Sequence, residues 1–181
     1  MKKSFFSVPL RTIGSLSCLI STASFASEVT AIKELDLQQY LGTWYEIASF
    51  PAIFQAGCSC TKAQYSANND ASVKVLNSCN VNFLGGTPIS FTGSARIPDA
   101  SQNSKLKVRF FGSFEADYWV LALAPDYSYA MVGTPDKRFL WVLSRERTLS
   151  NDVLAQLKET AQSQGFDLAS LRSTKQTECK E

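Results

Sequence analysis

The sequence predicts an all-β fold, namely an eight-stranded antiparallel up-and-down β-barrel with one α-helix packed on its outside. Three observations lead to this prediction. Short β-rich runs separated by turn residues fill the chain from Gly42 to Ser144. Most connections between these runs are short, so neighbouring strands are expected to pair. A single amphipathic segment follows the last run, and the length of 181 residues suits one domain.

The first 26 residues have the pattern of a secretory leader, which makes residues 27–181 the mature domain. Lysines open the segment, an apolar run follows, and the small residues of Ser24–Ala26 precede the expected cleavage point. The uncharged run is short and rich in Ser and Thr, whereas a spanning helix needs about 20 apolar residues. We expect export to the periplasm. Acylation at Cys18 is the alternative that would attach the protein to the outer membrane, but SLSC lacks the usual lipobox leucine.

Charge and histidine content exclude several classes of function. Without the leader the chain has 15 basic and 16 acidic residues, so nothing indicates a nucleic-acid partner. The chain contains no histidine, which removes the commonest general base and the commonest metal ligand. We therefore expect no His-dependent catalytic triad, no metal and no cofactor.

The exported part of the chain keeps an even number of cysteines, Cys58, Cys60, Cys79 and Cys179. In an oxidising compartment, two disulfides are the default interpretation. The alternative is that the GCSC stretch forms a redox or metal site, for which CxC spacing without histidine is poor support.

Eight candidate strands follow from the pattern of β-rich runs. The stretches between them, such as ANNDAS, LGGTP and TPDK, are rich in residues that favour turns. In chain order, the candidate strands are residues 43–50, 59–66, 72–80, 89–97, 105–112, 117–124, 128–134 and 138–145.

Alternation assigns faces to the earlier strands. In KLKVRF, Leu106, Val108 and Phe110 share one face, and the intervening basic residues share the other face, which we expect to meet water. In SVKVLN, Val75 and Asn77 likewise share a face.

Two later strands are instead apolar at consecutive positions, YWVLALA at 118–124 and FLWVLS at 139–144. Such runs are typical of strands that are buried on both faces. We expect one face to look into the barrel and the other to lie beneath the helix.

The segment TLSNDVLAQLKETAQSQGFDL predicts that helix. Ser150 can cap its start, Leu149 can act as a hydrophobic staple, and Gly165 can end it. Its apolar face consists of Val153, Leu154, Leu157 and Ala161 at helical spacing.

Three separated motifs match one family: GTWYEI at Gly42–Ile47, DYWVLAL at Asp117–Leu123 and LWVLSR at Leu140–Arg145. On these motifs, their order and their spacing, the chain resembles the lipocalins and, within them, the subgroup of bacterial outer-membrane lipocalins and apolipoprotein D. The resemblance extends over about Leu37–Cys179, so residues 27–181 are interpreted as a lipocalin domain.

The resemblance implies a structural signature made of Gly42, Trp44 and Arg145. In lipocalins the tryptophan sits at the closed end of the barrel, and the arginine stacks over it and donates to backbone carbonyls. A guanidinium on an indole face gains cation–π attraction while its planar fork satisfies the carbonyls. GTWYEI is therefore expected to plug the barrel rather than to bind ligand.

The resemblance and strand parity together suggest which residues line the cavity. An eight-stranded barrel is just wide enough to be filled by side chains or to hold one small ligand, and the family implies the second. We also expect Lys62, Arg96 or Arg109 to meet an acidic head group near the mouth. The resemblance places Tyr65, Asn77, Tyr118 and Trp141 in the cavity, and parity adds Val75, Phe91, Leu106, Val108, Phe110 and Val120.

The resemblance also bears on the cysteines. Cys60 matches the cysteine that ties the second strand to the C-terminal tail in apolipoprotein D, which implies a bond to Cys179 and leaves Cys58 to pair with Cys79. The swapped pairing, Cys60 with Cys79 and Cys58 with Cys179, stays open because both early cysteines lie near Cys79 in a hairpin.

The loop 49–57 is long and apolar and contains Phe50, Ile53 and Phe54. We expect it to hang over the barrel mouth, first as a lid that tucks these residues inside, otherwise as a membrane patch or a dimer contact. Phe83 and Leu84 are expected at the same rim.

The resemblance implies a protein that binds and transports or stores a small hydrophobic ligand, a fatty acid or a lysophospholipid, as a monomer or homodimer with peripheral membrane contact. It is not expected to be an enzyme. The alternatives are a protein-interaction or membrane-maintenance role through loop 49–57, or an isomerase with a cavity thiol, which needs a free thiolate.

Overall fold

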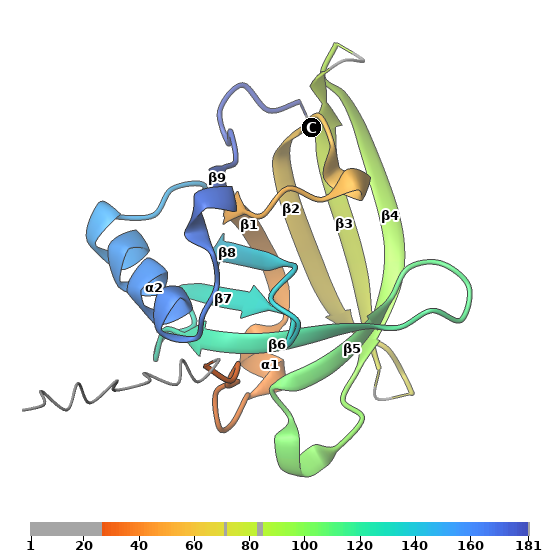
Figure 1. Cartoon of the computed structure of the whole chain (residues 1–181). Coiled ribbons are helices and arrows are strands. Elements are labelled where there is room, and N and C mark those ends of the chain that lie inside the picture. Colours follow the sequence, from red (N-terminus) through yellow and green to blue (C-terminus); the bar gives the residue numbers. More distant parts are fainter. Residues whose placement is uncertain (1–26, 71, 83–84, 181) are drawn as a thin grey trace, which may run out of the picture.

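A computed structural model describes residues 27–70, 72–82 and 85–180 and shows the predicted barrel (Figure 1). Each strand pairs antiparallel with the next, and β1 pairs with both β2 and β8, which closes the sheet. The strands are β1 Gly42–Ser49, β2 Cys58–Ala67, β3 Val73–Val81, β4 Thr87–Arg96, β5 Lys105–Arg109, β6 Ala116–Leu123, β7 Tyr129–Gly133 and β8 Leu140–Ser144.

Several short elements were not predicted. The helix α1 (Leu37–Tyr40) precedes the barrel, and the two-residue strand β9 (Arg172–Ser173) pairs with β1. Among the described residues, single-turn 3₁₀ helices cover Ile53–Gln55, Ala100–Gln102 and Leu168–Ser170. Elements this short are set by local caps and tertiary contacts, which periodicity cannot detect.

Strand β5 ends at Arg109, three residues before the predicted end. A Cβ atom at Gly93 of β4 would lie 2.5 Å from the Arg109 carbonyl oxygen and 2.6 Å from the Phe110 ring. Because Gly93 has no side chain, the Phe110 ring fits against β4 at the point where the chain after β5 diverges from that strand. The part of β4 nearer the mouth consequently has no β5 neighbour.

Helix α2 (Asn151–Ser163) packs on the outside of the barrel, as predicted (Figure 1). The Ser150 hydroxyl caps it by accepting from the Val153 amide at 3.3 Å, and Gly165, with φ +82°, follows its end. The helix-side core joins α2 to the outer faces of β6, β7 and β8, so these strands are buried on both faces. Its buried members are Val29, Ala48, Phe50, Leu121, Met131, Leu140, Val142, Leu157, Ala161 and Phe166.

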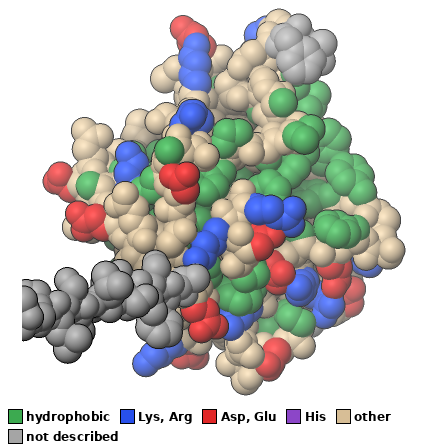
Figure 2. Space-filling view, viewed as in Figure 1, with side chains coloured by type: hydrophobic (Ala, Val, Ile, Leu, Met, Phe, Trp, Pro, Cys, Tyr) green, Lys and Arg blue, Asp and Glu red, His purple; other side chains and the backbone are tan. Residues whose placement is uncertain are grey.

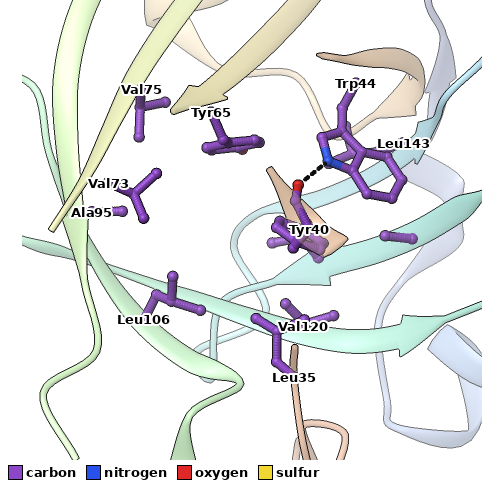
Figure 3. Packing of buried hydrophobic residues seen from close by; sticks show 12 residues of the cluster. Leu35, Tyr40, Trp44, Tyr65, Val73, Val75, Ala95, Leu106, Val120 and Leu143 are labelled. Carbon is purple, nitrogen blue, oxygen red and sulfur yellow. Dashed lines mark hydrogen bonds between the residues drawn. The ribbon is translucent and has the colours of Figure 1, made fainter. Parts of the chain in front are cut away.

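The barrel interior holds a second cluster, the barrel core (Figure 3). In β6, Val120 faces this core, and a bulge between Val120 and Ala122 leaves both Leu121 and Ala122 on the helix side before Leu123 faces the core again. The buried members of the barrel core are Leu35, Tyr40, Trp44, Tyr65, Val73, Val75, Ala95, Leu106, Val120, Ala130, Val132 and Leu143.

The C-terminal tail completes the wall where β1 and β2 stop pairing. The Thr174 amide donates to the Ile47 carbonyl at 2.9 Å, and the Cys60 amide donates to the Lys175 carbonyl at 2.7 Å. The Gln176 side chain donates to carbonyls on both strands, at 2.8 and 2.7 Å. Disulfides join Cys60 to Cys179 and Cys58 to Cys79, the pairing that the resemblance implied.

Candidate functional site

The closed end of the barrel is built on Trp44 and Arg145. Trp44 is fully buried and donates from its ring nitrogen to the Tyr40 carbonyl at 2.8 Å (Figure 3). The Arg145 guanidinium carbon lies 3.8 Å from the centre of the indole ring. Gly42 leaves room for the guanidinium, because a Cβ there would lie 3.2 Å from Arg145 Nη1 and φ is +99°.

The same guanidinium satisfies three backbone carbonyls that the strands do not pair. Its nitrogens donate to the carbonyls of Thr43 at 2.9 Å, Gln39 at 2.7 Å and Tyr127 at 3.3 Å. This arrangement seals one end of the barrel.

Three tyrosines form a layer above this plug. The Tyr118 hydroxyl lies 2.8 Å from the Tyr40 hydroxyl and 2.9 Å from the Tyr65 hydroxyl. They share the layer with apolar side chains around a cavity of about 10 Å³, which is roughly the room that one water molecule needs. The floor of the barrel is thus filled by side chains.

Burial raises the pKa of all three phenols, that of Tyr65 to about 12, because an ionised phenolate would be desolvated there. An unfolded tyrosine ionises near pH 10, so the folded state binds more protons above that pH and stability falls as pH rises toward 12. We expect Tyr65 alone to remove about 3 kcal/mol from the free energy of unfolding over this range. A phenolate absorbance titration followed together with circular dichroism checks this.

In that titration, the three phenols of the tyrosine layer should ionise only as the barrel unfolds. Ionisation of every tyrosine near pH 10 in a folded barrel would contradict the buried layer. The variant Tyr118→Phe removes the hydroxyl whose hydrogen bonds lower the pKa of the other two phenols, so Tyr65 should ionise at still higher pH in the folded state.

Nine of the ten residues expected to line the cavity occupy inward positions on their strands, and the tenth, Phe110, follows the end of β5 and packs against the barrel core. Six are grouped around and above the tyrosine layer: Tyr65, Val75, Leu106, Val108, Tyr118 and Val120. The other four lie nearer the mouth: Asn77, Phe91, Phe110 and Trp141.

The four residues of this upper group differ in exposure. Asn77 is opposite Ala63 on β2 and Phe91 on β4, both inward positions. Phe91 is 44% exposed and packs against Phe111 with ring centres 6.0 Å apart, so it forms part of the rim. Trp141 stacks on Phe139 with ring centres 5.6 Å apart. The upper barrel therefore offers aromatic surface and one amide.

The three cations expected to meet an acidic head group near the mouth, Lys62, Arg96 and Arg109, all point away from the barrel interior. Lys62 is opposite Ser78, Arg109 is opposite Ser94, and both pairs alternate with inward residues, so these side chains point outward. Arg96 also lies on the outer face and forms a bidentate pair with Glu115. On the eight described strands, every lysine and arginine occupies an outward position.

Sequence reasoning missed one ionisable residue on the inward side, Glu46 of the GTWYEI motif. It is only 5% exposed, and its carboxylate accepts from Ser49 and Gln55 side chains at 2.9 and 2.8 Å and from Thr174 at 2.5 Å. The Gln55 side chain in turn accepts from Trp141 at 3.1 Å. Glu46 thus ties loop 49–57 and the C-terminal tail to β1. Its position two residues after Trp44 on the same strand is the sequence signal that indicates an inward direction.

The loop 49–57 does not behave as the predicted lid. Ile53 is 97% exposed and Phe54 is 62% exposed, so neither is tucked into the barrel. Phe50 lies in the helix-side core against Phe166, because β1 changes its alternation at a bulge between Glu46 and Ala48. Phe83 and Leu84, which we expected at the same rim, lie outside the described residues.

Exposed aromatic residues also occur on the loop between β5 and β6, where Phe111 and Phe114 are 68% and 78% exposed. Figure 2 shows hydrophobic side chains gathered on the side of the molecule where β4 and this loop lie. The rim of the barrel is therefore markedly apolar.

No described helix is long and apolar enough to cross a membrane. Among the same residues, no group of three or more Cys, Asp, Glu or His side chains could hold a metal ion.

Comparison with known proteins agrees with this geometry. A family model described as a lipocalin-like domain matches residues 35–176. The outer membrane lipoprotein Blc of Escherichia coli is 38% identical over 141 residues, which cover 78% of this chain and 79% of that protein. Mouse apolipoprotein D is 33% identical over 156 residues, covering 81% and 80%.

A solved structure shows the same architecture. Insecticyanin from the tobacco hornworm Manduca sexta superposes with a TM-score of 0.67 at 26% identity, covering 85% of this chain and 87% of that one.

Proposed function

The chain belongs to the lipocalin family, whose members bind small hydrophobic ligands, and we propose that it carries or stores a single-chain amphiphile, a fatty acid or a lysophospholipid. The observation that supports this most directly is the inward face of the upper barrel. There, aromatic side chains and the Asn77 amide lie above a filled floor. Such a lining suits an apolar tail with few polar atoms.

The driving force is removal of the tail from water. Each buried methylene contributes about 0.8 kcal/mol, and the sum is reduced by the cost of association. Tyr40, Tyr65 and Tyr118 bond to one another, so the tail is proposed to end against this layer rather than to pass it.

The charged head is proposed to stay at the mouth. A carboxylate or phosphate inside the barrel would be desolvated without a cation, since the described strands direct their lysines and arginines outward. The buried carboxylate of Glu46 adds repulsion. Binding should therefore depend on chain length more than on the type of head group.

Catalysis is not part of the proposal. Cys58, Cys60, Cys79 and Cys179 form disulfides, so none of these thiols is available as the nucleophile that a cavity-thiol isomerase would need. The related proteins named above are consistent with a binding role.

We also propose export to the periplasm with association to the outer membrane. The leader in residues 1–26 and the acylation alternative at Cys18 lie outside the described residues. Support comes from the Escherichia coli relative, which is named an outer membrane lipoprotein. The two disulfides suit an oxidising compartment.

The test of ligand binding is native mass spectrometry of the protein purified from its own periplasm, followed by lipid analysis of an organic extract. A stoichiometric lipid adduct supports the proposal and names the ligand class. An empty barrel that also fails to take up a fluorescent fatty acid would contradict it.

A membrane contact through the mouth is a second candidate function, favoured by the exposed Ile53 and Phe54. The double variant Ile53→Ser/Phe54→Ser should bind lipid vesicles at least tenfold more weakly, because each side chain loses about 1–2 kcal/mol of transfer free energy. Vesicle co-sedimentation measures this.

The control for the vesicle assay is Ala56→Ser, a polar change at an exposed position of the same loop, which should have little effect. Light scattering without lipid distinguishes the alternative occupant of this surface, a second copy of the chain. Loss of a dimer in the double variant, with vesicle binding unchanged, would assign the loop to a homodimer contact instead.

A further inference from the structure

Two hydrogen bonds in series join Glu46, Gln55 and Trp141 near the mouth of the barrel. Gln55 Nε2 donates to Glu46 Oε2 at 2.8 Å, and Trp141 Nε1 donates to Gln55 Oε1 at 3.1 Å. Glu46 belongs to β1, Gln55 ends the 3₁₀ turn Ile53–Gln55, and Trp141 belongs to β8. This series, which we call the mouth bridge, connects loop 49–57 to an inward residue of the upper barrel.

The two ends of the mouth bridge determine how the Gln55 amide is turned. A carboxylate accepts hydrogen bonds, whereas an indole N–H can only donate one. Gln55 therefore bonds to both ends only with Nε2 toward Glu46 and Oε1 toward Trp141. Glu46 is itself held in place, because it is 5% exposed and its Oε1 accepts from the Ser49 and Thr174 hydroxyls at 2.9 and 2.5 Å. The carboxylate thus fixes the acceptor that Trp141 uses.

Aromatic contacts hold the same turn and the same indole ring from another direction. Phe54, the neighbour of Gln55, packs on Phe139 with ring centres 5.8 Å apart. Phe139 in turn stacks on Trp141, with ring centres 5.6 Å apart and planes 12° from parallel. The backbone of Trp141 is paired with both β1 and β7. Strand pairing, ring stacking and the bond to Gln55 together restrict the orientation of the Trp141 ring.

From these contacts we propose that Glu46 and Gln55 are positioning residues for the ligand, which act by holding the Trp141 ring in place as part of the upper barrel wall. This inference rests on the proposed function. The indole nitrogen is occupied by Gln55, so Trp141 offers the ligand apolar ring surface and no hydrogen-bond donor. A ring that is ordered before binding loses less conformational entropy when an acyl chain packs against it.

The test begins with Glu46→Gln, which places an amide where Gln55 needs an acceptor. Gln55 then keeps a bond to position 46 only by turning its own amide, which removes Oε1 from Trp141. In nitrogen-15 NMR spectra, the indole N–H of Trp141 should shift and exchange with solvent about fivefold faster. The affinity for hexadecanoic acid, measured by displacement of a fluorescent fatty acid, should fall about fivefold.

The other two indole N–H groups serve as references in the same spectra. Trp44 donates to the Tyr40 carbonyl and Trp119 to the Asp117 carboxylate, so neither signal should change. Gln55→Ala removes the acceptor from a half-buried surface turn, and it should reproduce the change at Trp141. This second variant provides the test even if Glu46→Gln does not fold.

A rescue variant distinguishes positioning from a purely structural role. Glu46→Gln/Gln55→Glu exchanges the two groups, so the new amide donates to the new carboxylate, which also accepts from Trp141. Protection of the indole N–H and affinity should both return to within twofold of wild type. The matched control is Thr174→Val, which removes a donor to Glu46 without touching Gln55. Any loss of thermal stability there should leave the Trp141 signal and the affinity unchanged.

The outcomes separate this inference from the proposed function. An unchanged Trp141 signal in folded Glu46→Gln and Gln55→Ala, or no recovery in the folded rescue variant, would overturn the positioning role. Wild-type affinity in both single variants would also overturn it, although the wild-type protein binds the fatty acid. Absence of binding by the wild-type protein would instead contradict the proposed function itself. Near-UV circular dichroism verifies that each variant is folded.

Discussion

Replacing Asn77 with tryptophan is expected to abolish binding of a fatty acid or lysophospholipid in the barrel. Asn77 is half-buried on the inward face of β3, between Ala63 and Phe91. An indole at this position would occupy the space above the tyrosine layer, and a clash with the tail would replace the apolar contacts that drive binding. Affinity should fall at least a hundredfold, as about 3 kcal/mol of tail burial is lost.

Titration of a fluorescent fatty acid measures this loss. The matched control is Lys74→Trp on the same strand, where the side chain is exposed on the outward face and the same indole should leave binding unchanged. Thermal unfolding shows whether Asn77→Trp is folded. A folded Asn77→Trp variant with wild-type affinity would place the ligand outside the barrel and move the proposed function to the apolar mouth.

Arg145→Ala is expected to lower the free energy of unfolding by about 3 kcal/mol. This should be the largest effect of any single substitution of a solvent-accessible residue at the closed end. The variant loses the stack on Trp44 and leaves the carbonyls of Thr43, Gln39 and Tyr127 without this donor. Hydrogen bonds from a charged donor are stronger than those from a neutral donor. Removing Arg145 should therefore lower the free energy of unfolding more than removing a solvent-exposed arginine does. Urea unfolding monitored by tryptophan fluorescence measures it.

Arg145→Lys should recover only part of the stability, because an ammonium keeps the charge but lacks the planar fork that reaches several carbonyls. Arg138→Ala provides the control, since Arg138 is 76% exposed and its pair with Asp136 lies at the surface. Its effect should stay within about 0.5 kcal/mol. Equal losses in Arg145→Ala and Arg138→Ala would show that the closed-end contacts do not stabilise the fold.

Much of the fold could be predicted because it depends on periodicity and turn chemistry. The alternation of Leu106 and Val108 on β5, and the consecutive apolar residues of β6 and β8, identified which faces are buried. Ser150 and Gly165 marked the limits of α2. Each of these signals is local, and each is confirmed in the structure.

The errors arose where a bulge or a distant segment changed the direction of a side chain. The bulge after Glu46 moved Phe50 from the mouth into the helix-side core. Parity placed Arg109 on the face that meets water, and the same alternation directs Lys62 outward, so neither side chain points into the barrel. The tail residues that complete the wall, such as Gln176, have no periodic signal of their own.

The sequence by itself determined the family, through its three motifs, and the barrel, because a two-residue period and short connections leave few other ways to bury the apolar side chains. Only the tertiary structure decided how much of the interior is filled, where the cations lie and what joins the tail to the wall. The tyrosine layer and the buried Glu46 each combine segments far apart in the chain. Contacts of this kind depend on packing in three dimensions, which no local pattern records.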